Sequence, residues 1–221
     1  MAPKKRTSSG TVKNALVQLK NVKEHQVVSV SGKVMSKSGL MTKSATGTVW
    51  AWVDIQDAEE GSKLRLKSFG AMANRIAKLK FLETFDFHNF KVEKGFGVQF
   101  EAAPVKGGAV VEENKINLNP DATWDQKEYG PLTDLQPGEE KSSNLNFLLK
   151  VVKRGEMHEE WLTVGVIDEE ATEDSIKVHE THDENVTTGS FCVVHRAKMQ
   201  DDVCVVDAWA MVAPAPQSYC W

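Results

Sequence analysis

TVWAWVDIQDAEEGSKLRLKSF, residues 48–69, is the stretch that decides the fold. Successive side chains of a strand point to opposite faces, and here an aliphatic set alternates with an aromatic and polar set: Val49, Ala51, Val53 and Ile55 against Trp50, Trp52, Asp54 and Gln56. After a short acidic turn, a second strand places Leu64 and Leu66 opposite Arg65, Lys67 and Phe69. The pattern predicts a curved sheet with an aliphatic inside and an outside suited to stacking bases and holding phosphates.

The composition is that of a globular chain. It has 221 residues, of which 41% are hydrophobic, enough for one large or two small packed cores. Residues 1–10 (MAPKKRTSSG) carry charge without an apolar stretch, and no apolar run approaches the length of a membrane span. We therefore expect an intracellular protein. Three cysteines without CxxC spacing argue against a zinc site and a disulfide framework.

Charge divides the chain into two unequal halves. Residues 1–120 hold 19 Lys and Arg against 11 Asp and Glu, whereas residues 121–221 hold 8 against 20. A basic half beside an acidic half suggests that the first faces a polyanion and the second a different partner. The alternative is that both charge sets are ordinary solvated surface.

The order of expected elements defines the first domain, residues 23–119, after a basic tail and lead-in at residues 1–22. A first strand is expected at residues 26–35, bent at Gly32, and a flexible segment at residues 36–47 carries Lys37 and Lys43, which would close over a ligand. Residues 71–80 have helical spacing, and strands follow at residues 85–92 and 97–102, with a further strand near residues 110–118. Three strands, a plug helix and two strands form the oligonucleotide- and oligosaccharide-binding (OB) fold, a five-stranded Greek-key barrel.

Three segments of the first domain resemble a known family. GKVMSKS, WVDIQDAEEGSKLRLKSFGAMANRI and FHNFKVEKGF are similar to segments of the single-stranded-DNA-binding OB domains of the replication protein A large subunit. The resemblance implies base-stacking aromatics at Phe69 and Phe96, with Phe100 as a rival for the second position. It also implies phosphate contacts at Lys33, Arg65 and Lys91. Trp50 and Trp52 depart from the family pattern and predict either a larger stacking platform or a surface covered by another part of the protein.

The acidic half is expected to repeat the architecture. Residues 120–141, with three prolines, are expected to be a linker, and Trp124 and Tyr129 are expected to dock on a barrel. Residues 142–214 then form a second OB barrel, with strands at 146–152 and 161–168 around a turn at Arg154-Gly155, and at 175–179, 190–197 and 203–212, before a tail at 215–221. We predict an all-β protein of two tandem OB barrels.

The second barrel has fewer outward candidates for ligand contact. Trp161 and Lys177 are secondary candidates, but they stand among many acidic residues whose field repels phosphate. Self-association or docking of a protein partner therefore competes with nucleic-acid binding, and we slightly favour the partner role.

Chemistry for catalysis is not predicted. His179 and His182 lie three residues apart, but at a strand end rather than on a helix, so a polar loop is favoured over a metal site. Cys192 and Cys204 are expected to be core thiols, and Trp209 is expected to be a core residue. No phosphate-cradling or nucleophile-elbow motif occurs in the sequence. We expect no enzyme, no cofactor and no metal.

The sequence predicts a non-catalytic single-stranded-DNA-binding protein of replication, repair or telomere type. The contact residues predicted on the first barrel are Lys33, Lys37, Lys43, Trp50, Trp52, Arg65, Lys67, Phe69, Lys91 and Phe96. Two alternatives stay open: an assembly module of a replication or telomere complex, and a single-stranded RNA binder. Pro3-Lys4-Lys5-Arg6 weakly favours the nucleus, and a viral replication compartment is the other expected location.

Overall fold

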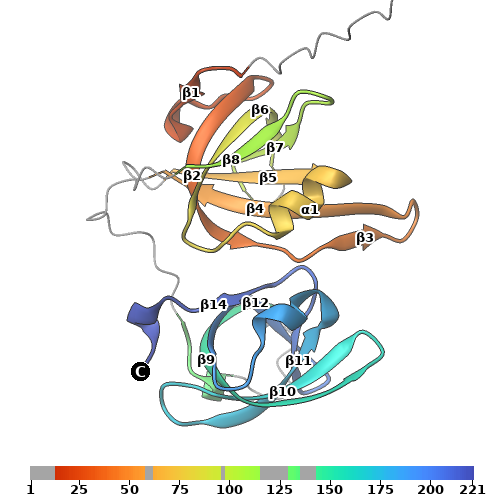
Figure 1. Cartoon of the computed structure of the whole chain (residues 1–221), viewed down its shortest axis with the longest axis vertical. Coiled ribbons are helices and arrows are strands. Elements are labelled where there is room, and N and C mark those ends of the chain that lie inside the picture. Colours follow the sequence, from red (N-terminus) through yellow and green to blue (C-terminus); the bar gives the residue numbers. More distant parts are fainter. Residues whose placement is uncertain (1–12, 58–61, 96–97, 115–128, 135–142) are drawn as a thin grey trace, which may run out of the picture.

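The strand predicted after the basic N-terminal residues is present as β2 (Val27–Lys37), in the first of two β-barrels of the computed structural model (Figure 1). The structure describes residues 13–57, 62–95, 98–114, 129–134 and 143–221. The other elements of the first barrel region are β1 (Leu16–Val17), η1 (Leu19–Asn21), β3 (Met41–Lys43), β4 (Thr48–Gln56), β5 (Lys63–Phe69), α1 (Ala71–Ala77), β6 (Thr84–Lys94), β7 (Phe100–Pro104) and β8 (Val110–Glu113).

The first barrel closes through five strands. β2 pairs with β4 and with β6, β4 with β5, and β6 with β7, all antiparallel, while β5 and β7 pair in parallel. β2 can pair with both β4 and β6, and so close the barrel, because it bends sharply. Gly32 permits the bend, since a Cβ atom there would lie 2.9 Å from the Cβ of Ile55. β1, β3 and β8 extend the sheet as additional strands.

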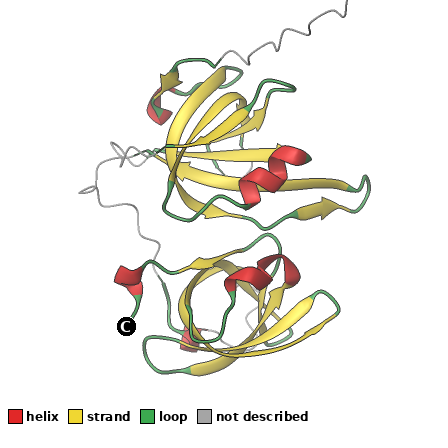
Figure 2. Ribbon diagram, viewed as in Figure 1, coloured by secondary structure: helices red, strands yellow, loops and turns green. Residues whose placement is uncertain are grey.

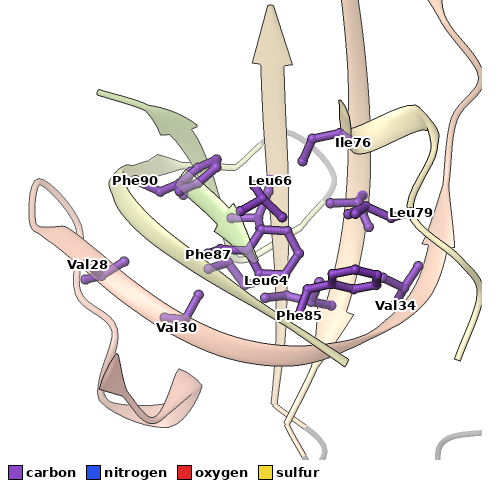
Figure 3. Close-up of a cluster of buried hydrophobic side chains, with 14 of the residues drawn as sticks. Val28, Val30, Val34, Leu64, Leu66, Ile76, Leu79, Phe85, Phe87 and Phe90 are labelled. Atoms are coloured by element: carbon purple, nitrogen blue, oxygen red, sulfur yellow. The ribbon is translucent and has the colours of Figure 1, made fainter. Parts of the chain in front are cut away.

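The helix predicted between the third and fourth barrel strands is confirmed as α1 (Figure 2). Its Ala73 and Ile76 are buried against the aliphatic inner faces of the strands. Figure 3 shows this core, in which three phenylalanines of β6 (Phe85, Phe87 and Phe90) meet the leucines of β5. The alternation predicted for residues 48–69 is therefore confirmed on its inner side.

The second barrel repeats the plan and confirms the predicted tandem OB architecture. Its elements are β9 (Ser143–His158), β10 (Trp161–Ile167), β11 (Glu173–His179), η3 (Glu180–Asn185), β12 (Phe191–Gln200), β13 (Val203–Val206) and β14 (Met211–Pro214), with η2 (Leu132–Asp134) before them and η4 (Gln217–Tyr219) after them. Closure again uses five strands, with β11 and β13 parallel and β14 added to β12. The short helix η3 takes the place of the plug.

Two local predictions for this barrel are wrong. The first turn lies at Glu159-Glu160 rather than at Arg154-Gly155, where β9 continues with a register shift in its pairing with β10. Gly155 is instead a point of close approach, where a Cβ would lie 2.8 Å from the carbonyl oxygen of Thr163. The strand expected at residues 203–212 is divided into β13 and β14, because residues 207–210 form a turn. Among the described residues, no helix has the length and apolar character needed to cross a membrane.

Candidate functional site

The outward face of β4 and β5 carries the predicted side chains in opposed pairs. Trp50 lies opposite Phe69, Trp52 opposite Lys67, and Asp54 opposite Arg65. Side chains paired in this way across an antiparallel ladder lie about 5 Å apart. The aromatic and basic residues therefore form one continuous surface on the first barrel, as the alternation predicted.

The second barrel covers the part of this surface that lies on β4. We call this contact between the barrels the seam; it includes Trp50, Trp52 and Asp54 of the first barrel and Arg196 and Trp209 of the second. Figure 1 shows the second barrel beside β3 and β4, with β12 and β14 on its near side. The ring centroid of Trp209 lies 5.4 Å from those of both Trp50 and Trp52. Trp52 is 0% exposed and Trp50 is half-buried. Of the two alternatives predicted for Trp52, an open stacking platform or a surface covered by another part of the protein, the structure shows the second, because its outward face packs against the second barrel.

Ionic contacts reinforce the seam. The Asp54 carboxylate accepts hydrogen bonds from Arg65, at 2.7 and 2.9 Å, and from Arg196 of the second barrel, at 3.0 Å. The two guanidinium carbons also lie 4.7 and 4.1 Å from the Trp52 ring centroid. Arg65 is 6% exposed, so its predicted role as a phosphate contact does not fit this arrangement. Burial lowers the pKa of Arg196.

A β-bulge aims Arg196 into the seam. The pairing of β12 with β9 shifts register between His195 and Ala197, and Arg196 has a φ of 66°, in the left-handed region that non-glycine residues rarely occupy. A bulge redirects one side chain out of the alternation. This local geometry places the Arg196 guanidinium on Trp52 and Asp54.

Histidine contacts and a small apolar cluster complete the seam. His195 is buried, with Nδ1 3.4 Å from the Ser36 hydroxyl and Nε2 3.1 Å from the hydroxyl of Tyr129. Phe81 of the first barrel packs edge-on to the same imidazole and joins the apolar cluster on the outer face of β12 and β14. The prediction that Tyr129 docks on a barrel is confirmed. Trp124 and most of the predicted linker lie outside the described residues.

The β5 side of the surface remains open. Phe69 is 40% exposed, and the Lys43 ammonium lies 5.3 Å from its ring centroid. Lys67 is partly exposed and pairs with Glu101 at 2.6 Å. An accessible ring flanked by two cations, one on the connection between β2 and β4, can stack a base while the cations contact its phosphates.

The other residues predicted on the first barrel do not converge on this surface as one group. Lys37 is half-buried, donates a hydrogen bond to the carbonyl oxygen of Ala77, and has its pKa lowered to about 8 by burial. It lines a cleft of about 640 Å³ between the barrels, beside residues of η3 and β14. Burial also lowers the pKa of Lys33. Lys91 is exposed and lies 3.5 Å from Glu93, and Phe100 packs partly against the core. Phe96 lies outside the described residues.

The second barrel presents a different surface. Trp161 is half-buried, with its ring edge-on to His179 at 5.3 Å, and Lys177 is exposed. The turns that join β9 to β10 and β12 to β13 have two residues each, Glu159-Glu160 and Asp201-Asp202. The corresponding connections of the first barrel have ten and five residues. The second barrel therefore lacks long loops at the positions where the first barrel has them.

His179, His182, Cys192 and Cys204 have structural roles in the second barrel. His179 Nδ1 accepts the backbone N–H of Thr181 and caps η3, while His182 Nε2 donates to the carbonyl oxygen of Asp207. Burial raises the pKa of the Cys192 and Cys204 thiols to about 12. Within the part of the chain that the structure describes, no three His, Cys, Asp or Glu residues are grouped to hold a metal ion.

Sequence reasoning missed Trp209 as a residue of the site, and it treated Arg196 as an outward residue of the second barrel without placing it against the first. Trp209 sits in the apolar run VCVVDAWAMV and was expected in the core. The interrupting Asp207, a residue type that favours turns, is the signal that a turn follows β13. Arg196 carries no comparable signal, because a bulge is set by pairing with a distant strand.

Comparison with known proteins supports the architecture. No protein-family model matches the sequence, and no curated protein matches it. Among solved structures, 91% of the chain aligns with 52% of a chain in a replication protein A heterotrimer bound to ssDNA, with a TM-score of 0.66 and 12% identity. The chain thus spans about half the length of that relative.

Two other structural matches have lower TM-scores. A murine DNA binding protein bound with ds DNA has a TM-score of 0.40 and 12% identity over 86% of this chain and 97% of its own. The replication factor A related protein from Methanobacterium thermoautotrophicum has a TM-score of 0.40 and 20% identity over 46% and 92%. Together with the two closed barrels, the match that spans both shows that this chain has a tandem OB fold.

Proposed function

We propose that this protein binds single-stranded DNA, without catalysis, on the outward face of β4 and β5. The observation that supports it best is the open end of that face, where Phe69 is 40% exposed beneath the Lys43 ammonium and beside the half-buried Trp50. An OB barrel uses the same pair of strands to present ligand-binding side chains. The relative that spans both barrels is itself bound to ssDNA.

Binding would combine stacking with phosphate neutralisation. A base stacked on an aromatic side chain contributes roughly 1 to 3 kcal/mol, whatever the base. Lys43 lies over the Phe69 ring and Lys67 lies two residues before it on β5. Lys33, Lys37 and Lys91 stay predicted phosphate contacts outside this face. Trp52 and Arg65 are not among the proposed contacts, because the seam buries both. The interaction would tolerate many sequences.

A fluorescence titration tests this proposal. Addition of oligo-dT at low salt should quench tryptophan emission through Trp50, and the affinity should fall steeply as salt rises, because phosphate contacts release counterions. Duplex DNA of the same length should bind more weakly, since its bases are not free to stack. Absence of quenching and of any mobility shift with oligo-dT at low salt would refute the proposal. Oligo-rU in parallel separates DNA from RNA binding, which the fold permits equally.

A protein-docking role for the second barrel is a second candidate function. Its two-residue turns leave no long loop to close over a strand, and β9 exposes Val152 at 42% and Met157 at 41%. The acidic charge of this half disfavours phosphate. Self-association or docking of a replication or repair partner would use this surface. A partner of that kind would place the protein in the nucleus. Light scattering after size exclusion tests self-association: the wild type should be larger than one chain, and a monomer at all concentrations would exclude it.

A further inference from the structure

We propose that Trp209, on the second barrel, is a further base-stacking residue, so that a bound single strand crosses the seam from one barrel to the other. Trp209 lies in the turn between β13 and β14. This inference rests on the proposed function, and it extends the binding surface onto a barrel that its charge alone would exclude.

The aromatic rings form a strip across the seam. Met41, Trp50 and Phe69 occupy matching positions on β3, β4 and β5, so their side chains follow one row. Trp209 continues the row from the second barrel, with its ring centroid 5.4 Å from that of Trp50 and the planes inclined by 55°. Trp50 and Trp209 are both half-buried, so part of each indole stays accessible. The strip therefore runs from the open Phe69, through Trp50, to Trp209.

The turn that carries Trp209 is fixed before any ligand binds. The Asp207 carboxylate accepts the backbone N–H groups of Trp209, at 2.9 Å, and Ala210, at 3.2 Å. From the first barrel, the N–H of Gly39 donates to the carbonyl oxygen of Ala208 at 3.0 Å. Because the backbone is held from both barrels, the indole would lose little further freedom when a base stacks on it.

The charges around Trp209 differ from those of the rest of the second barrel. Lys198 neutralises Asp207 at 2.7 Å, and Arg65 and Arg196 share Asp54. This group holds three cations and two carboxylates, whereas residues 121–221 as a whole hold 8 Lys and Arg against 20 Asp and Glu. The carboxylates beside Trp209 are therefore paired with cations, unlike most acidic residues of the second half of the chain.

Fluorine NMR on the wild-type chain tests the inference without altering the fold. Six tryptophans labelled as 5-fluorotryptophan give separate signals, which single Trp→Phe variants assign. On titration with oligo-dT, the signals of Trp50 and Trp209 should both shift, while that of Trp221, which packs edge-on against Phe191, should stay unchanged. A shift of Trp50 without a shift of Trp209 would overturn the inference and leave the proposed function standing.

An affinity measurement gives the second arm. Trp209→Leu keeps an apolar side chain in the seam but removes the stacking ring, so oligo-dT affinity should fall roughly 5- to 150-fold. Trp221→Leu is the matched control, because Trp221 is an exposed tryptophan that packs edge-on against Phe191, and it should bind as the wild type does. If Trp209→Leu binds oligo-dT as tightly as the wild type, the inference is wrong. If it binds more tightly, the inference is also wrong, because Trp209 would then cover the binding site rather than contribute to it. Absence of both binding and NMR shifts in the wild type would instead refute the proposed function.

Discussion

Replacing Asp54 with alanine should destabilise the whole chain, because this carboxylate holds two guanidinium groups at the seam. The Arg65, Arg196 and Asp54 side chains are 6%, 17% and 19% exposed. Removing one partner of a mostly buried ion pair typically costs about 3 to 5 kcal/mol, since the charge left behind stays poorly solvated. For a chain of this length, a loss of that size lowers Tm by roughly 6 to 20 °C.

Thermal and denaturant unfolding of the full chain measure this loss. Asp183→Ala is the matched control, because Asp183 pairs with Arg154 where the side chains are 37% and 40% exposed, and such pairs contribute about 0 to 1 kcal/mol. A double-mutant cycle with Arg196→Ala then isolates the contact between barrels and should give a coupling of at least about 1 kcal/mol. A loss below about 1 kcal/mol for Asp54→Ala would show that the seam does not depend on this carboxylate.

Three further perturbations test the seam. Burial lowers the pKa of His182 to about 4 from its ordinary 6.5, so the unfolded chain binds a proton at higher pH than the folded chain does. The free energy of unfolding should therefore fall by up to about 3 kcal/mol between pH 6.5 and 4. His182→Gln should lose this pH dependence in denaturation experiments, and a pH profile equal to that of the wild type would contradict the prediction. A Cβ at Gly39 would lie 2.6 Å from the Thr181 hydroxyl, so Gly39→Val should loosen the seam and shift tryptophan emission to longer wavelength, unlike Gly108→Ala, whose nearest neighbour lies at 3.8 Å. Residues 1–120 alone should emit at longer wavelength and unfold more easily than the full chain, because Trp52 would be uncovered; a blue, stable fragment would show that the seam is dispensable.

Alternation in residues 48–69 was enough to predict both strands and which side chains face the core. It was not enough to predict what covers the outer face. Trp52 satisfies the pattern of an outward residue and is still 0% exposed, because the covering surface comes from residues more than 140 positions later, such as Arg196. Local periodicity records the direction of a side chain relative to its own sheet and contains no information on a second domain.

The remaining differences between the predicted and the observed structure lie in the turns. The Arg154-Gly155 dipeptide has the composition of a turn, but the actual turn uses Glu159 with a φ of 56° and Glu160. Glutamate gives no sequence signal for positive φ, so pairing of β9 with β10 decides the position. Asp201 and Asp202, with φ of 50° and 60°, are in contrast of a residue type that favours turns, and they lie between two strands that the sequence predicted.

Phe69→Ala in an oligo-dT titration tests the central claim most directly. Phe191 is the matched control, since it is also a partly exposed phenylalanine beneath a lysine ammonium, that of Lys150 at 5.5 Å, but it lies on β12 of the second barrel, with its ring against Trp221. We predict that Phe69→Ala weakens binding roughly 5- to 150-fold, and that Phe191→Ala binds as the wild type does. Equal affinity of the wild type and Phe69→Ala, with both variants folded, would contradict the claim that β4 and β5 form the binding face.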